Sequence, residues 1–312
     1  MILNLRLTNA QSASNPTIDP GLHVATSPQQ TTPRTRSDRR PATDAAVRAG
    51  ADTDAGETFE IRDVAYRVDG RTILEVSDLD FRSGSLSGLI GPNGAGKSTL
   101  IKLMARQQRP SAGSIRFDGK ALGEWRDREF ARRVAYLPQE TPTAPGLTVE
   151  ELVALGRYPW HGPLGSFDED DRERVEQALV RADVARFSDR LVETLSGGER
   201  QRVWLAMLLA QDADCLLLDE PTSALDVAQQ VEVMRLVRSL SRDEGLGVVV
   251  VLHDVNNASR FCDRLVALHR GEVVARGRPA ELVENDVLQS IYGVDMGILR
   301  HPSRGYPISF VQ

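Results

Sequence analysis

The segment "GPNGAGKST", from Gly91 to Thr99, restricts the possible folds of this chain more than any other stretch. It follows a short apolar stretch, "LSGLI", and precedes "STLIKLM", whose apolar residues recur with helical spacing. The pattern G-x-x-x-x-G-K-[ST] between a strand and a helix is typical of a phosphate-binding loop, in which glycines let backbone N–H groups curl toward phosphate oxygens. The sequence therefore predicts a strand, a loop and a helix that together hold a nucleotide.

Two side chains of this loop carry further chemistry. Lys97 supplies a mobile positive charge for the β- and γ-phosphates, and the Ser98 hydroxyl is a candidate ligand for Mg²⁺. The start of the helix adds its partial positive charge. We therefore predict ATP and Mg²⁺ as cofactors. The nucleotide-binding residues predicted here are Gly91, Pro92, Asn93, Gly94, Ala95, Gly96, Lys97, Ser98 and Thr99.

Two adjacent carboxylates end the apolar segment "CLLLDEP", which runs from Cys215 to Pro221 and is typical of a buried strand. If that end is buried, both carboxylates need partners, because an unpaired buried charge is costly. We interpret Asp219 as a ligand of Mg²⁺ through water, and Glu220 as the general base that polarises the attacking water. The alternative is a solvated strand end without a catalytic role.

Two more polar residues follow apolar strands. Gln139 ends "VAYLPQ" and is a neutral ligand able to reach both the metal and the attacking water. His253 follows "VVVVL" and has the form of a γ-phosphate sensor, an imidazole that faces a polyanion from the end of a central strand. Taken alone, Gln139 fits a surface residue and His253 a structural histidine. Only the other nucleotide-binding motifs of the chain favour a catalytic role for these two residues.

An aromatic side chain upstream of the loop, Tyr66 in "VAYRV", is a candidate for stacking on the adenine ring. Packing in the core is the alternative, since Phe59 and Phe81 in the same region also need apolar partners. Both interpretations stay open from the sequence.

The stretch "LSGGERQR", from Leu195 to Arg202, resembles a second phosphate-binding helix start. A hydroxyl residue, Ser196, precedes two glycines, Gly197 and Gly198, and a charged helical run follows them. These residues offer N–H donors and a helix dipole to an anion. One chain with one complete phosphate loop has no evident need for a second phosphate site.

Composition and apolar periodicity divide the chain into an N-terminal tail and a folded part. Residues 1–56 hold five prolines among polar residues without apolar periodicity, which predicts a disordered tail. Its "RTRSDRR" cluster could touch anionic lipid headgroups, whereas a solvated tail or a start codon assigned too far upstream explains it more simply. From residue 57 onward, apolar strands alternate with helices, which predicts a mostly parallel sheet covered on both faces.

Further elements are expected on both sides of that sheet. The opening strands suggest a small antiparallel sheet set against the parallel one. Residues 148–156 and 167–187 are typical of amphipathic helices, the second with Ser166 as part of its cap and an acidic first turn.

Composition limits the classes of partner. The net charge of −6 argues against a nucleic acid, whose phosphates need a basic surface. No apolar run reaches the roughly eighteen residues needed to span a bilayer, so contact with a membrane is expected only through another subunit. The start "MILNLRL" lacks the pattern of a signal peptide, and Cys215 and Cys262 lie in apolar segments as expected of reduced structural thiols.

In this chain order the motifs resemble those of the ATPase subunit of ABC transporters: Gly91–Thr99, Gln139, Leu195–Gln201, Asp219–Glu220, Ser223–Asp226 and His253. "LSGGERQ" matches the signature of that family and is far more specific than a phosphate loop. The resemblance implies an α/β fold, a P-loop NTPase with a RecA-like core, an antiparallel β subdomain and an inserted helical subdomain at about residues 146–194. The ATP-binding domain would span residues 57–312.

The resemblance also explains the second phosphate-binding helix start. In this family two ATPase subunits pair head to tail, and the signature of one covers the γ-phosphate held by the loop of the other. Ser196, Gly197 and Gly198 would therefore serve a second copy of the chain, and Asp226 would lie at the interface. The implied metal ligands are Ser98, Gln139 and Asp219.

A narrower resemblance is to the ATPases of bacterial ferric-siderophore importers, above all the ferric-hydroxamate (ferrichrome) type. It rests on "TVEELVALGRYPWHGPLGSF", "VVVLHDVNNASRFCDRLVALHRGEVVARG" and the ending "IYGVDMGILRHPSRGYPISFVQ". It implies a permease, a siderophore-binding protein that feeds it, and a peripheral position on the cytoplasmic face of the inner membrane. Cobalamin, haem and other siderophores are alternative cargoes. Tyr158 and Trp160 are candidates for docking on the permease or for packing inside the helical subdomain.

Two other classes of protein are weighed against this one. A soluble ABC protein of DNA repair needs long heptad segments between the nucleotide motifs, and only residues 140–194 separate Gln139 from the signature. Ribosomal relatives carry two cassettes in one chain, and this chain has one. A binding module that no longer hydrolyses ATP is disfavoured because Glu220 and His253 are both present.

Overall fold

The computed structural model describes residues 57–162, 165–223 and 225–312, so the predicted tail, residues 1–56, lies outside the described part. Within that part, ten strands form one sheet in the order β5-β4-β1-β2-β10-β9-β3-β8-β7-β6, and two more pair as β11-β12. The strands are β1 (Glu57–Val68), β2 (Arg71–Arg82), β3 (Leu86–Ile90), β4 (Ala112–Phe117), β5 (Lys120–Ala121), β6 (Val134–Leu137), β7 (Cys215–Leu218), β8 (Gly247–Val251), β9 (Arg264–His269), β10 (Glu272–Gly277), β11 (Met296–Arg300) and β12 (Pro307–Val311).

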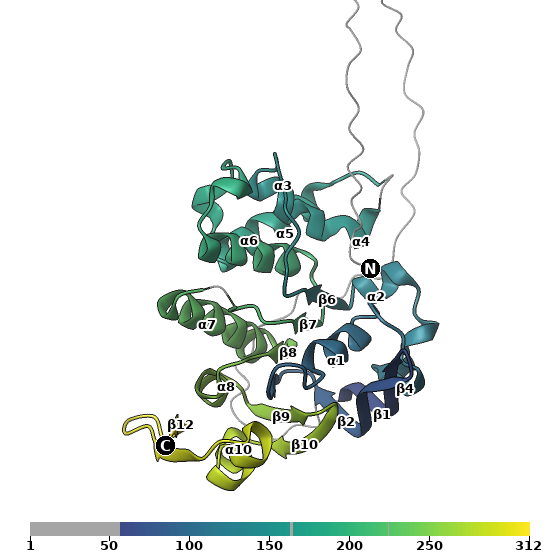
Figure 1. Ribbon diagram of the computed structural model, residues 1–312. Coiled ribbons are helices and arrows are strands. Elements are labelled where there is room, and N and C mark those ends of the chain that lie inside the picture. Colours follow the sequence, from purple (N-terminus) through teal and green to yellow (C-terminus); the bar gives the residue numbers. More distant parts are fainter. Residues whose placement is uncertain (1–56, 163–164, 224) are drawn as a thin grey trace, which may run out of the picture. The chain divides into compact units, whose positions relative to one another are not determined.

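Helices alternate with these strands along the chain (Figure 1). They are α1 (Lys97–Met104), α2 (Asp127–Ala131), α3 (Val149–Ala154), α4 (Tyr158–His161), α5 (Glu169–Arg181), α6 (Gly197–Ala210), α7 (Val227–Glu244), α8 (Val255–Phe261), α9 (Pro279–Leu282) and α10 (Asn285–Tyr292), with four single 3₁₀ turns at Leu122–Glu124, Leu155–Arg157, Ala185–Phe187 and Val192–Thr194. None of the helices in the described ranges is long and apolar enough to cross a membrane.

The parallel part of the sheet, β9-β3-β8-β7-β6, is apolar on both faces. Because side chains alternate along a strand, each strand supplies two cores. Leu216, Leu218, Val248 and Val250 belong to one core, and Cys215, Leu217, Val249 and Val251 belong to the other. This division explains why these strands have continuous apolar sequences, as the sequence predicts.

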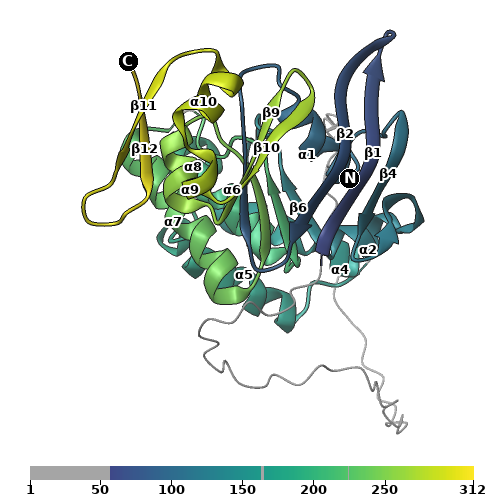
Figure 2. The same ribbon diagram turned by 90° about the horizontal axis from the view of Figure 1, so that it is seen from below.

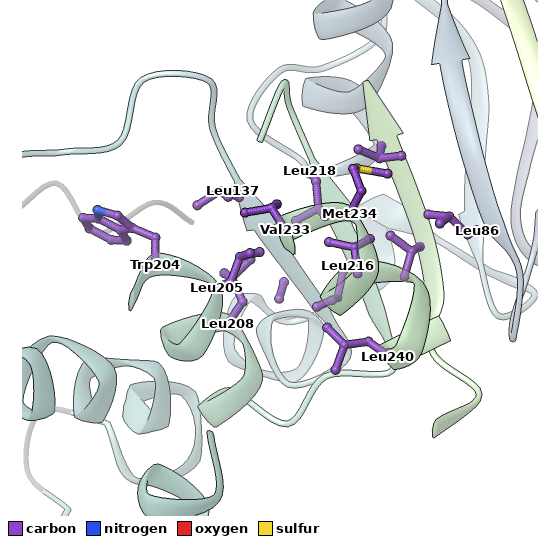
Figure 3. Close-up of a cluster of buried hydrophobic side chains, with 14 of the residues drawn as sticks. Leu86, Leu137, Trp204, Leu205, Leu208, Leu216, Leu218, Val233, Met234 and Leu240 are labelled. Atoms are coloured by element: carbon purple, nitrogen blue, oxygen red, sulfur yellow. The ribbon is translucent and has the colours of Figure 1, made fainter. Parts of the chain in front are cut away.

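The first core lies between the sheet and helices α6 and α7. Figure 3 shows Leu205 and Leu208 of α6 near Leu216 of β7 and Met234 of α7. The second core lies on the side of α1, whose Leu100, Ile101, Leu103 and Met104 pack with the first strands of the chain.

The antiparallel strands β1, β2 and β4 lie side by side at one end of the sheet (Figure 2). The sequence predicts a small antiparallel sheet set against the parallel one, and the structure instead shows one continuous sheet. β2 joins β10 in parallel through the pair Glu272 and Glu75, so the antiparallel strands continue the parallel part edge to edge.

Between β6 and β7 the chain forms helices α3 to α6, in which α6 packs against α3 and α5 (Figure 1). Thr148 begins α3 with a capping box to Glu151. The cap of α5 is Asp168, whose carboxylate accepts from the Asp171 N–H, and not Ser166 as expected. An aspartate is the stronger cap because its charge also meets the positive end of the helix dipole.

Candidate active site

The loop between β3 and α1 is held in backbone conformations that favour glycine. Gly91, Gly94 and Gly96 have φ angles of 137°, 77° and 99°. A Cβ on Gly91 would stand 2.1 Å from the Leu268 carbonyl oxygen of β9, and one on Gly96 would stand 2.9 Å from Leu74 Cδ1. Side chains at these two positions would collide with the strands behind the loop, so the sequence of the loop follows from its packing.

Lys97 folds back over this loop. Its Nζ donates to the carbonyl oxygens of Gly91 at 2.8 Å and Pro92 at 3.0 Å, and the residue is only 5% exposed. Burial lowers the pKa of Lys97, an effect opposed by the nearby carboxylates of Glu220 and Asp219. The ammonium group thus lies at the centre of the loop, where a phosphate would offer it stronger acceptors than carbonyls.

The start of α1 points the loop's remaining donors in one direction. The first internal bond of the helix runs from the Leu100 N–H to the Gly96 carbonyl at 2.9 Å. The N–H groups of Lys97, Ser98 and Thr99 precede it and have no carbonyl partner within the helix. Ala95 donates to Pro92 at 3.2 Å, and Asn93 and Gly94 are exposed at the rim. This arrangement is suited to an anion.

Asp219 lies beside the loop on the face of the sheet that carries α1. It is fully buried, and its Oδ1 accepts from the Ser98 hydroxyl at 2.8 Å. Burial raises the pKa of Asp219, while the Ser98 bond and the charges of Lys102 and Lys97 act in the opposite direction. Among the described residues, its buried Oδ2 has no hydrogen-bond partner. A free buried carboxylate oxygen next to a hydroxyl fits Mg²⁺, which prefers oxygen ligands and keeps some of its waters.

Glu220 is held between two predicted site residues. Its Oε2 accepts from Gln139 Nε2 at 2.6 Å, and its Oε1 lies 2.6 Å from His253 Nε2. Glu220 is 8% exposed and has a φ of 54°, a left-handed conformation that is rare for a side chain of this size. The three residues come from the ends of β6, β7 and β8, which are adjacent in the sheet. The structure therefore brings together Glu220, the predicted base, His253, the predicted γ-phosphate sensor, and Gln139, the predicted neutral ligand of the metal and the water.

The signature segment opens α6 with a capping box. The Ser196 hydroxyl donates to Glu199 Oε2 at 2.8 Å, and the Ser196 N–H donates to the same oxygen at 2.9 Å. These bonds lower the pKa of Glu199. A Cβ on Gly198 would stand 2.5 Å from the Gln229 side chain of α7, whereas one on Gly197 would meet nothing within 4 Å in the described part of the chain. Internal packing explains Gly198 but not Gly197.

Asp226 is the cap of α7, and its Oδ1 accepts from the Gln229 N–H at 2.9 Å. Since Gln229 also touches Gly198, the starts of α6 and α7 lie together. Ser196, Gly197, Gly198 and Asp226 therefore form a second group of predicted residues. This group lies at the starts of α6 and α7, while the phosphate loop joins β3 to α1.

The position of Tyr66 near the loop is compatible with both of its interpretations, adenine stacking and core packing. It pairs with Leu74 across β1 and β2, and Leu74 is the residue that a Cβ on Gly96 would strike. The side chain is half-buried against the second core. Its place suits both an adenine platform and a packing residue.

The turn between β9 and β10 is a part of the site that sequence reasoning missed. The Gly271 N–H donates to the Ala95 carbonyl at 3.1 Å, and the Gly271 carbonyl accepts from the Glu75 N–H at 2.7 Å. The turn thus fastens the phosphate loop to β2. The sequence "HRGE" predicts a hairpin turn, but nothing in it indicates what the turn touches.

A glycine-rich loop between a parallel strand and a helix, with an acidic pair at the end of a neighbouring strand, defines a phosphate-loop nucleotide hydrolase of the α/β class. Comparison with known proteins narrows this class. The family model of the ABC transporter matches residues 74–223. The chain belongs to the ABC transporter family, as one of its ATPases.

Two curated relatives are import proteins. The iron(3+)-hydroxamate import ATP-binding protein FhuC of Bacillus subtilis (strain 168) is 41% identical over 239 residues, which are 76% of this chain and 88% of the relative. The hemin import ATP-binding protein HmuV of Rhodococcus jostii (strain RHA1) is 41% identical over 248 residues, or 80% of this chain and 84% of the relative. A bacterial ABC transporter cassette solved as a dimer has a TM-score of 0.62 and 30% identity, covering 70% of this chain and 98% of its own.

Proposed function

We propose that this chain hydrolyses ATP to drive the import of ferric hydroxamate siderophores through a membrane permease. The observation that carries the hydrolytic part of the proposal is Glu220, held between Gln139 and His253 beside the Ser98–Asp219 pair and the phosphate loop. The cargo is proposed from the likeness to the hydroxamate import relative. A base, a sensor and a metal ligand at one edge of a sheet meet the needs of phosphoryl transfer to water.

Binding of ATP engages the loop first. The N–H groups of Gly94, Gly96 and the first turn of α1 surround the phosphates, and Lys97 exchanges its two carbonyl partners for the β- and γ-phosphate oxygens. Ser98, Gln139 and Asp219 are the residues that would hold Mg²⁺. When bound, Mg²⁺ neutralises the charge that develops on the phosphates.

Hydrolysis then depends on Glu220. Its carboxylate accepts a proton from the attacking water, while Gln139 orients that water and His253 contacts the γ-phosphate. Because Gln139 and His253 both contact Glu220, the three side chains lie together before the substrate arrives, and His253 Nε2 exchanges Glu220 for the γ-phosphate. Such preorganisation avoids rearrangement at the moment of reaction.

The second group of residues serves a partner copy in a head-to-tail dimer. Ser196, Gly197, Gly198 and Asp226 would cover the γ-phosphate bound by the other chain. Gly197 supports this proposal, since nothing in the described part of its own chain explains the absence of a side chain there. The likeness to a cassette solved as a dimer agrees with pairing.

The rest of the assembly follows from the family. A helical subdomain at about residues 146–194 would dock on the permease, which would put the chain peripherally on the cytoplasmic face of the bacterial inner membrane. A siderophore-binding protein would deliver the cargo, and no nucleic acid takes part. The domain would begin near residue 57. Haem is the second candidate cargo, because a hemin import relative is as similar as the hydroxamate one.

The catalytic part is tested with Glu220→Gln in the purified full chain. The amide keeps the size of the side chain but cannot accept the proton, so we expect ATP binding to persist, hydrolysis to fall at least about a hundredfold, and dimers to accumulate with ATP. Nucleotide binding, phosphate release and sedimentation measure these three results. Hydrolysis at the wild-type rate would exclude Glu220 as the base.

The cargo is tested in cells that lack the gene. Uptake of ⁵⁵Fe-ferrichrome should be lost, and should return with the wild-type gene but not with the Glu220→Gln gene. Normal ferrichrome uptake together with lost haem uptake would assign haem as the cargo.

A further inference from the structure

The segment "RYPWH", Arg157 to His161, lies where the helices between β6 and β7 meet the sheet. Trp160 is 36% exposed, yet its one polar group is hydrogen-bonded and its ring lies near two guanidinium groups. Its Nε1 donates to the Gln211 carbonyl at 2.8 Å. The guanidinium carbons of Arg132 and Arg157 each lie 5.0 Å from the ring centroid, within the range of cation–π attraction.

The two arginines reach Trp160 from different parts of the chain. Arg132 stands just before β6, and it donates to the carbonyls of Pro159 at 2.9 Å and Trp160 at 3.0 Å. Arg157 belongs to the helical segment. It is 3% exposed, pairs with the buried Asp171 at 2.7 Å and donates to the Ala210 carbonyl at 2.9 Å. The ring is thus fastened to both sides of the junction.

The C-terminal end of α6 is part of the same junction. Besides the bonds to the carbonyls of Ala210 and Gln211, the Gln211 side chain donates to the carbonyls of Ala131 and Val134. A Cβ on Gly156 would stand 2.2 Å from the Met207 carbonyl oxygen, so the backbone before Arg157 rests directly on α6. The end of α6 is therefore fixed to the start of β6.

We propose that Trp160, held by Arg132 and Arg157, is a positioning residue for ATP hydrolysis. It acts through α6, whose C-terminal end it fixes and whose N-terminal end carries Ser196 and Gly197. This inference rests on the proposed function, in which Ser196 and Gly197 complete the active site of the partner.

Because α6 is long, a small movement at the junction becomes a larger movement at its N-terminal end. Its 14 residues span about 21 Å from Ala210 to Gly197. A rotation of about 5° at the fixed end moves the other end by about 2 Å over that length. Errors of about 1 Å in the placement of groups around a reacting phosphate are enough to slow catalysis strongly. A loosened junction would therefore impair hydrolysis without touching the phosphate loop.

The test uses the purified full chain without a permease, and the variants Trp160→Ala and Trp160→Phe. In Trp160→Ala we expect ATP affinity within about twofold of wild type, kcat lowered about tenfold, and a higher ATP concentration for dimerisation in the Glu220→Gln background. Trp160→Phe keeps a ring beside the arginines but loses the bond to Gln211, so its kcat should lie between those of the wild type and Trp160→Ala. General destabilisation would weaken ATP binding as well, so a lower kcat with unchanged ATP affinity distinguishes a positioning role from it.

Phe187→Ala is the matched control. Its ring also lies under two guanidinium groups, those of Arg186 at 4.7 Å and Arg190 at 5.3 Å, but all three residues belong to the helical segment. The charges of Arg186 and Arg190 also act on Glu199, which caps α6, so we expect Phe187→Ala to lower kcat by less than Trp160→Ala does.

Three results would overturn the inference. The first is wild-type hydrolysis and dimerisation by Trp160→Ala with defects seen only when the permease is present, which would assign Trp160 to docking. The second is equal loss in Phe187→Ala. The third, should Trp160→Ala fail to fold, is wild-type kcat in Trp160→Phe. Failure of Glu220→Gln to dimerise with ATP would instead contradict the proposed function, and with it the composite site that Trp160 is inferred to serve.

Discussion

At the scale of single residues, two residues of the site have unusual backbone conformations. Glu220 adopts a left-handed backbone at a cost of about 1–3 kcal/mol, and its bonds to Gln139 and His253 hold it there. Gly91 has a φ of 137° for a different reason, because the loop passes directly over the Leu268 carbonyl. In both cases the surrounding structure holds the backbone in its conformation.

Two glycines of the loop, Gly91 and Gly94, are expected to tolerate substitution differently. Gly91→Ala should abolish ATP binding, because its Cβ would lie 2.1 Å from a backbone oxygen of the neighbouring strand, which cannot move aside. Gly94→Ala meets nothing within 4 Å in the described chain and carries only the left-handed cost of about 1–2 kcal/mol. Titration with a fluorescent ATP analogue measures both variants. Equal affinities would show that the collision is relieved elsewhere.

At the scale of elements, a buried ion pair joins two helical pieces. Arg157 and Asp171 are both nearly inaccessible, and their carboxylate–guanidinium contact is 2.7 Å. Burial alone would raise the pKa of Asp171, but bonds from Arg157 and the Asp168 N–H, with the charge of Arg157, bring it below its ordinary value of 3.8. The stability that this lowered pKa contributes is present above about pH 4 and is lost as the pH falls through the folded value.

Asp171→Asn should therefore change both stability and its dependence on pH. At pH 7 we expect the free energy of unfolding to fall by about 3 kcal/mol, because the variant leaves a buried guanidinium without its counter-charge. Toward pH 3 the wild type loses the same interaction, so the difference should narrow. Urea unfolding over this pH range measures it.

Asp170→Asn is the control for this prediction. Asp170 is 69% exposed and lies 3.9 Å from the same arginine, so its loss should change stability by less than about 1 kcal/mol. A pH-independent difference between Asp171→Asn and the wild type would refute the role given to the carboxylate.

At the scale of the whole molecule, the proposed dimer makes a prediction about mixtures. Lys97→Ala should lose ATP binding, and Ser196→Arg should bind ATP but not hydrolyse it, because its lesion lies across the interface. Mixing the two inactive proteins should restore part of the activity. One of the two sites in a mixed dimer pairs an intact loop with an intact signature.

Phosphate release from the mixture, compared with each variant alone, measures this complementation. Dimers of identical variants provide the control, since neither contains an intact composite site. No gain on mixing, at concentrations where dimers form, would place the signature beside the nucleotide of its own chain.

Local patterns in the sequence predicted most of the elements around the site. The glycine spacing from Gly91 to Gly96, the apolar run before Asp219 and the run before His253 specified loop and strands through short-range rules. The sequence predicts Ser166 as part of the cap of α5, whereas the cap is Asp168, because an acidic residue two positions on competes for the same N–H groups. It also predicts a small antiparallel sheet set against the parallel one, since nothing local indicates that β2 pairs with β10.

By itself, the sequence determined the chemistry available to this protein: a phosphate loop, an acidic pair, a signature segment and the family that carries them in this order. Only the tertiary structure decided which groups meet. Glu220 lies between Gln139 and His253 because β6, β7 and β8 are neighbours in the sheet. Trp160 lies near both Arg132 and Arg157 because α6 ends at the start of β6. Such contacts join residues far apart in the chain, and they depend on strand order and helix packing, which no local pattern encodes.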